Sequence, residues 1–184
     1  IAAFYNDQDK PEKVEPLLIE ALNICRSKSS KPDISNSLGI LAVFYCNQNK
    51  PEKADPLLIE ALEINREYYS NNSREVLHPL HNLANFYNNQ NKPKQAEPLL
   101  IEIIDIIRAQ NNGEPDEFVK SLNTLANFYS LHNKPKKAEP LYIEALDIAL
   151  ECSKLLNYKI IDFGIYKALN RLAIFYCKQN MPKT

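Results

Sequence analysis

Hydrophobic and polar positions along the chain repeat in blocks. The clearest copy runs from Leu125 to Ile148, and copies in register with it lie at 83–106 and 41–64. Within each copy, apolar residues such as Leu125 and Tyr129 follow helical spacing, which places them on one face of a helix. A second apolar helix follows after a short polar break. Each block therefore predicts two helices, and the fixed period predicts stacked units rather than one globular core. Phe-Tyr pairs mark the period, at intervals of 40, 42, 42 and 47 residues: Phe4-Tyr5, Phe44-Tyr45, Phe86-Tyr87, Phe128-Tyr129 and Phe175-Tyr176.

The polar break has the same composition in each block. Asparagine tolerates the left-handed conformation that closes a helix. Lysine before proline is pushed out of the α region, and proline fits the first position of the following helix. The pattern predicts a tight turn at Asn49-Lys50-Pro51, Asn91-Lys92-Pro93 and Asn133-Lys134-Pro135.

Other signals refine the helix boundaries. Ser73 is placed to cap the helix that follows it. Five extra residues before the last block, around 155–162, predict longer helices or a bulged turn. A second proline recurs five residues into the second helix of each block, where it predicts a mild bend: Pro16, Pro56, Pro98 and Pro140.

The order of small and large residues resembles the tetratricopeptide repeat. Ala126 and Tyr129 in the first helix are followed by Ala138, Tyr142 and Ala145 in the second. The length of the block and its Ala-Glu-Pro-Leu run resemble the kinesin-light-chain type of that repeat, although asparagine or aspartate stands where the family often has glycine near the turn. HEAT and armadillo repeats share the length range but lack this Ala-Tyr-Ala spacing.

The resemblance implies an all-α fold, a right-handed α-solenoid (superhelix) of stacked antiparallel helix hairpins. We expect one array over residues 1–184. Both ends fall inside the repeat, so we expect the chain to be a piece of a longer protein. The predicted units are 1–32 (partial), 33–73, 74–114, 115–159 and 160–184 (partial).

By resemblance, the first helices of the units build the inner wall of a groove, and the positions opposite the core stripe face it. A side-chain amide both donates and accepts, so an asparagine wall can pair with the backbone of an extended peptide. The alternative is that many of the 21 asparagines are solvated positions on a helix face. The candidate peptide-binding residues are His78, Asn82, Asn85, Asn89, Lys120, Asn123, Asn127, Lys167, Asn170, Arg171 and Lys178.

Cations and apolar residues divide this predicted groove. Lys120, Lys167, Arg171 and Lys178 favour an acidic residue or a C-terminal carboxylate of the ligand toward the C-terminal units. Ile40 and Val43, in the second unit, favour a hydrophobic side chain of the ligand.

Composition excludes several other functions. The net charge of −1 gives no overall field toward nucleic acid or an anionic membrane. His78 and His81 have a spacing used by metal sites, but a third ligand is missing at i+4, so we expect no metal. The chain holds no Ser-His-Asp order, phosphate-cradling glycine loop or paired buried carboxylates, so we expect neither an enzyme nor a cofactor. Four cysteines without Cys-x-x-Cys spacing predict free thiols in a reducing, cytoplasmic compartment.

The sequence therefore predicts a scaffold that binds a protein or an extended peptide, with no small-molecule substrate. An alternative is the sensor or regulatory array of a larger multidomain signalling enzyme. RNA binding is disfavoured by the charge balance. We also expect self-association, because an uncapped solenoid end exposes a face that a neighbouring repeat normally covers.

Overall fold

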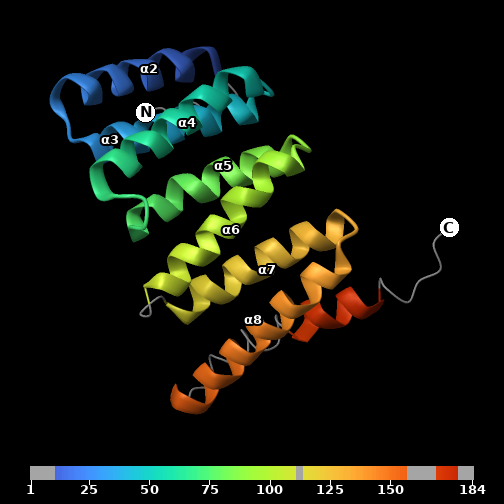
Figure 1. The fold of residues 1–184 in the computed structure, drawn as a ribbon. Helices are drawn as coiled ribbons and strands as arrows, with labels where there is room; N and C mark the ends of the chain where they lie inside the picture. Colours follow the sequence, from blue (N-terminus) through green and yellow to red (C-terminus); the bar gives the residue numbers. More distant parts are fainter. Residues whose placement is uncertain (1–10, 111–113, 157–168, 178–184) are drawn as a thin grey trace. The chain divides into compact units, whose positions relative to one another are not determined.

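The computed structural model describes residues 11–110, 114–156 and 169–177, and the described part is helical without β-strands (Figure 1). The all-α fold predicted from the sequence is confirmed. The chain forms two compact units, Ile1–Leu99 (unit 1) and Leu100–Thr184 (unit 2). The elements are α2 (Pro11–Lys28), α3 (Lys31–Asn47), α4 (Pro51–Tyr69), the 3₁₀ helix η1 (Arg74–Val76), α5 (Leu77–Asn89), α6 (Pro93–Ala109), α7 (Pro115–Leu131) and α8 (Pro135–Leu156), followed by a helical stretch at 169–177.

The helix turns have the predicted conformation. Asn49, Asn91 and Asn133 have φ angles of 54°, 54° and 57°, in the left-handed region. After Asn49, the Lys50 N–H donates to the Tyr45 carbonyl at 2.9 Å, and the Asn49 N–H donates to the Cys46 carbonyl at 3.0 Å. This pair of bonds is a Schellman motif, which satisfies carbonyls that the helix end would leave unpaired. The second helices α4, α6 and α8 then begin at the prolines.

In unit 1, α3 packs against α4. On either side of this pair, α2 packs against α3, and α5 packs mainly against α4. Alanines without exposed surface lie at the close approaches, Ala42 on α3, Ala54 on α4 and Ala84 on α5. Without a side chain beyond Cβ, they let helix backbones approach while leucine and aromatic side chains fill the space beside them. Each such large side chain stabilises the folded state by about 1.5–3 kcal/mol through burial.

Unit 2 repeats this packing between α7 and α8. Ala126 on α7 and Ala138 on α8 are again fully buried, and Phe128 is 2% exposed. Phe175, from the 169–177 stretch, stacks at a tilt on Tyr142 of α8, with their ring centroids 5.4 Å apart. The alanines and aromatic residues of α3 to α5, α7 and α8 named here are therefore core positions, as the spacing predicts, whereas Ala173 and Tyr176 of the 169–177 stretch are exposed.

Other expectations meet mixed outcomes. Ser73 precedes the next helix as predicted, but that helix opens as the 3₁₀ turn η1, and the Ser73 hydroxyl donates to Glu75 rather than capping a backbone N–H.

α8 has 22 residues against 17 to 19 in α3, α4, α6 and α7, which agrees with the predicted lengthening. The second helices run through their exposed interior prolines, such as Pro56, and the predicted bend stays a prediction. So do the predicted unit boundaries. The helix expected before Pro11 lies outside the described residues.

The turn at Asn91 offers a direct test of its backbone. We expect Asn91→Ala to lower the free energy of unfolding by about 1 kcal/mol, because alanine adopts the left-handed conformation at a cost of about 1–2 kcal/mol. Asn91→Gly removes the Cβ that causes this cost and should leave the stability unchanged or slightly raised. Urea unfolding of both variants beside the wild type measures the difference. Equal losses for both variants would mean that the asparagine side chain, rather than the backbone, stabilises the turn.

Candidate functional site

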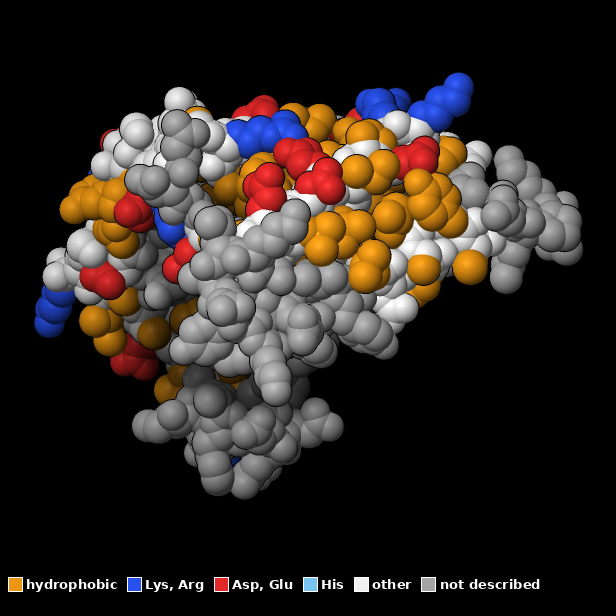
Figure 2. All heavy atoms as spheres, turned by 90° about the horizontal axis from the view of Figure 1, so that it is seen from below, with side chains coloured by type: hydrophobic (Ala, Val, Ile, Leu, Met, Phe, Trp, Pro, Cys, Tyr) orange, Lys and Arg blue, Asp and Glu red, His pale blue; other side chains and the backbone are white. Residues whose placement is uncertain are grey.

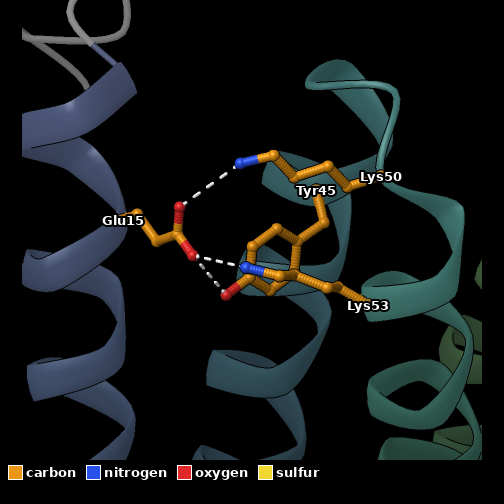
Figure 3. Close-up of polar contacts among 4 residues, drawn as sticks. All are labelled: Glu15, Tyr45, Lys50 and Lys53. Atoms are coloured by element: carbon orange, nitrogen blue, oxygen red, sulfur yellow. Dashed lines mark hydrogen bonds and ion pairs between the residues drawn. The ribbon is translucent and has the colours of Figure 1, made fainter.

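Within each unit, successive helix hairpins are joined by a hydrogen bond among the described residues. A tyrosine hydroxyl on the first helix of one hairpin donates to a carboxylate on the second helix of the hairpin before it. In unit 1, the Tyr45 hydroxyl on α3 donates to Glu15 Oε1 on α2 at 2.9 Å (Figure 3). Lys53 Nζ on α4 donates to the same oxygen at 3.0 Å, and Lys50 Nζ lies 3.6 Å from Glu15 Oε2. One carboxylate therefore holds three consecutive helices together.

The charges at this contact support one another. The hydrogen bond from Lys53, and next that from Tyr45, lower the pKa of Glu15. Burial, and next the bond to Glu15, raise the pKa of Tyr45. Near neutral pH the carboxylate is therefore ionised and the phenol is protonated, which is the pairing that the hydrogen bond needs.

The same contact recurs one repeat later and again in unit 2. The Tyr87 hydroxyl donates to Asp55 Oδ1 at 2.9 Å, and burial followed by this bond raises the pKa of Tyr87 to about 12. Tyr176 donates to Glu139 Oε1 at 2.7 Å. We call these contacts the tyrosine–carboxylate bonds. Sequence reasoning missed them, although a signal was present, since an acid precedes every recurring interior proline: Glu15, Asp55, Glu97 and Glu139.

Ion pairs also connect successive second helices. Arg26 Nη2 on α2 lies 2.6 and 2.8 Å from the two carboxylate oxygens of Glu60 on α4. Arg108 Nη2 on α6 lies 2.8 and 2.7 Å from those of Glu144 on α8. Both pairs are partly exposed, so each contributes at most about 1 kcal/mol to stability. Their geometry instead fixes the register between neighbouring second helices within each unit.

In unit 1, the surface of the first helices brings predicted site residues together. Ile40 and Val43 on α3 are 55% and 50% exposed. A Cβ added at Gly39 would lie 3.8 Å from Asn82 Nδ2 on α5, so the two helices are adjacent there. We call this surface the first-helix face of unit 1. The predicted site residues on α5 are His78, Asn85 and Asn89, which are exposed, and Asn82, which is half-buried.

In unit 2, the predicted site residues on α7 differ from one another. Lys120 and Asn127 are exposed. Asn123 is 4% exposed, and its Nδ2 donates to the Val119 carbonyl at 2.8 Å. The Asn127 amide oxygen accepts a hydrogen bond from the hydroxyl of Tyr142, a buried residue of α8.

The last group of predicted site residues is described in part. In the 169–177 stretch, Asn170 is exposed and Arg171 is half-buried. Burial raises the pKa of Tyr142, and the positive charge of Arg171 opposes that rise. Arg171 therefore lies close enough to the Tyr142 hydroxyl to act on its charge. Lys167 and Lys178 lie outside the described residues.

The described ranges show no arrangement for other chemistry. Among them, no three His, Cys, Asp or Glu side chains are grouped to hold a metal ion. Their four cysteines are free thiols, and those of Cys46 and Cys177 are exposed. None of the described helices combines the length and the apolar character needed to span a membrane.

Comparison with known proteins places this geometry among helical repeats. The family model of the tetratricopeptide repeat matches residues 33–109 and again 75–151. Among curated proteins, none matches the chain.

Several solved structures are similar. A protein described as a Podospora anserina kinesin light chain with nearly identical TPR-like repeats has a TM-score of 0.75 at 20% identity, over 95% of this chain and 81% of that one. BtubC from P. vanneervenii has a TM-score of 0.71 at 19% identity, over 100% and 80% of the two chains. A signal transduction ATPase with numerous domains from Pyrococcus horikoshii, described as having a tetratricopeptide repeat sensor, has a TM-score of 0.73 at 20% identity, over 97% of this chain and 25% of that one. These likenesses confirm the fold class, an α-solenoid of helix hairpins.

The tyrosine–carboxylate bond at Tyr87 predicts a pH-dependent stability. At neutral pH, we expect Tyr87→Phe to lower the free energy of unfolding by about 1–3 kcal/mol, because Asp55 loses a donor in a partly buried position. The folded-state pKa of about 12 exceeds the ordinary 10.0, so the unfolded chain releases the phenol proton first as the pH rises. The stability from Tyr87 is therefore complete below pH 10 and is lost between about pH 10 and about 12.

Urea unfolding at pH 9 and at pH 11 tests this. The wild type should lose more stability over that interval than Tyr87→Phe does. The matched control is Tyr68→Phe, since Tyr68 is 54% exposed, and it should show the wild-type pH dependence. Identical pH dependence in all three proteins would contradict the assigned role of Tyr87.

Proposed function

The chain belongs to the tetratricopeptide repeat family, and on that basis we propose that it is a non-catalytic interaction module that binds an extended segment of a partner protein along its first helices. Repeat proteins of this fold are commonly protein-interaction scaffolds. Two features of unit 1 support placing the partner on the first-helix face: its apolar pair and its row of amides.

The apolar pair is the observation that carries the proposal. Ile40 and Val43 lie three residues apart on α3, and each exposes about half of its side chain. Scattered exposed apolar residues are ordinary, but this pair lies next to a helix with a polar row, at the point where α5 lies beside Gly39. An apolar strip with polar groups beside it suits a peptide that buries one side chain while its backbone is hydrogen-bonded.

The amides of α5 can supply those hydrogen bonds. Within the described residues, the side chains of Asn82, Asn85 and Asn89 make no hydrogen bond to another group of the chain. Each amide has both a donor and an acceptor, so the row can pair with the N–H and C=O groups of an extended backbone. Hydrogen bonds to the peptide backbone do not depend on the peptide's sequence. The exposed pair Ile40 and Val43 would then favour peptides with an apolar side chain at the position that meets them.

Unit 2, taken by itself, supports a different chemistry. Lys120 on α7 is exposed, and Arg171 lies near Tyr142. These two cations favour an acidic group of the ligand in unit 2. On this proposal unit 1 takes an apolar group of a partner and unit 2 takes an acidic one, and the protein acts in the cytoplasm.

A second candidate function is that of a sensor array in a larger signalling protein. It is favoured by the likeness to the Pyrococcus horikoshii ATPase, in which the matching part is 25% of the chain. In that case the bound segment would change the activity of an attached domain. Both candidates require the same binding face, so tests of that face apply to both.

Substitution of the apolar strip tests the proposed face. Peptides selected from a random library on the wild-type protein serve as probes, with dissociation constants measured by fluorescence anisotropy. We expect Val43→Asp to weaken binding about tenfold or more, because a carboxylate then faces an apolar side chain that it cannot hydrogen-bond. Ile59→Asp is the matched control, since Ile59 is 38% exposed on the second helix α4, and it should bind like the wild type. Equal weakening by both substitutions would place the peptide elsewhere.

The charge preference gives a separate test. We expect a selected peptide to lose affinity, by about fivefold or more, when its acidic residues are changed to the corresponding amides. Arg171→Gln should remove most of that difference, while Lys136→Gln, at an exposed position of α8, should preserve it. A library that yields acidic and basic peptides with equal affinity would contradict the preference, even if binding to the apolar strip is confirmed.

A further inference from the structure

A shallow depression lies on α8 beside the start of α7, away from the proposed first-helix site residues. The ring of Phe118, near the start of α7, forms one wall, and the side chains of Pro140, Ile143 and Ile148 on α8 form the apolar floor. The acids Glu144, Asp147 and Glu151 complete the lining. In the view of Figure 2, taken from the α8 end of Figure 1, acidic side chains lie directly beside hydrophobic ones. We call this surface the α8 depression.

The charges around the α8 depression are mainly negative. Asp147 and Glu151 are exposed, and neither has an ion-pair partner within the described residues. Asp116, at the start of α7, adds to the negative charge near the end of α8, since burial, and next the charges of Asp116 and Glu151, raise the pKa of the Cys152 thiol. A cation brought to this rim would therefore meet the carboxylates of Asp147 and Glu151.

The chain itself shows how this surface holds a cation. The guanidinium carbon of Arg108 lies 5.9 Å from the ring centroid of Phe118, and Arg108 Nη2 lies 2.7 Å from Glu144 Oε2. An aromatic face and a carboxylate thus bind one guanidinium together, through a cation–π contact and a charge-assisted hydrogen bond. Arg108 forms an ion pair with Glu144 only, so the carboxylates of Asp147 and Glu151 remain available to a partner.

We propose that the α8 depression is a second docking surface, which takes a basic amphipathic helix of a partner protein. An apolar side chain of that helix packs against Phe118, Ile143 and Ile148. Arginine or lysine residues one turn away meet Asp147 and Glu151. Apolar floor and acidic rim match the two faces of such a helix. This surface lies mainly on a second helix and does not depend on the function proposed for the first helices.

α4 provides a matched control in the same chain. Its Glu63 and Glu67 occupy the block positions that Asp147 and Glu151 occupy in α8. On α4, however, Glu67 is already engaged, because Lys31 Nζ lies 2.6 Å from its Oε1. Paired substitutions on the two helices therefore change the net charge equally and alter different surfaces.

The probe is a fluorescein-labelled synthetic helix of leucine, alanine and arginine, with leucines along one face and arginines beside them. Its binding to the full chain is measured by anisotropy. We expect the double variant Asp147→Lys and Glu151→Lys to weaken binding about tenfold or more. The double variant Glu63→Lys and Glu67→Lys should stay within about twofold of the wild type. Ile143→Ser, or a probe with alanine for leucine, should also weaken binding, which separates apolar anchoring from general attraction between charges.

Other outcomes overturn the proposal. Equal losses in the two double variants would show a general charge effect. If the wild-type chain does not bind the probe even when the chain is in about 100-fold excess over it, the depression takes no such helix. Sedimentation that depends on concentration in the wild type, but not in the α8 double variant, would assign the surface to a second copy of this chain. Val43→Asp should leave probe binding unchanged, so failure here and failure of the first-helix proposal are distinguishable.

Discussion

The arrangement of unit 1 depends on one constraint, which is that a buried phenol needs an acceptor for its hydroxyl proton. Tyr45 and Tyr87 are 6% exposed, and in each case a carboxylate of the preceding second helix supplies the acceptor. This bond fixes the rotation of the first helix about its own axis. Because the axis rotation is fixed, Ile40 and Val43 point away from the core that Tyr45 enters. The exposed face that we propose for binding is therefore a consequence of the buried contact beneath it.

The helices, turns and core could be predicted from the sequence, because their signals are local. The left-handed turn at Asn91 follows from the properties of asparagine and of the proline that comes two residues later. The core stripe follows from 3.6-residue spacing. The tyrosine–carboxylate bonds join residues 30 to 37 positions apart, and a single sequence does not state which acid meets which tyrosine. Glu15 and Glu139 therefore had the same pattern as solvated acids.

The candidate site was predictable only in part, for a related reason. Asn123 and Gly39 both precede the Phe of a Phe-Tyr pair by five residues, and both are buried. A position opposite the core stripe can still be covered when the next first helix packs over it. Gly39 is an example, because Asn82 of α5 lies beside it. Helical spacing gives the direction in which a side chain points, but not what lies there. Tyr142 shows the converse, because its ring is buried while its hydroxyl reaches the exposed Asn127.

Differences between repeats determine which surfaces can bind a partner. Glu67 and Glu151 occupy the same block position, yet Lys31 pairs with the first, whereas the second has no such partner within the described residues. Similarly, α3 presents Ile40 where α5 presents Asn82. The period makes the hairpins stack, so it must be kept at the alanines, aromatic residues and turn asparagines. The outer positions are free of that requirement, and a change there alters surface chemistry at little cost in stability. Binding specificity in such an array therefore arises where the sequence departs from its own repeat.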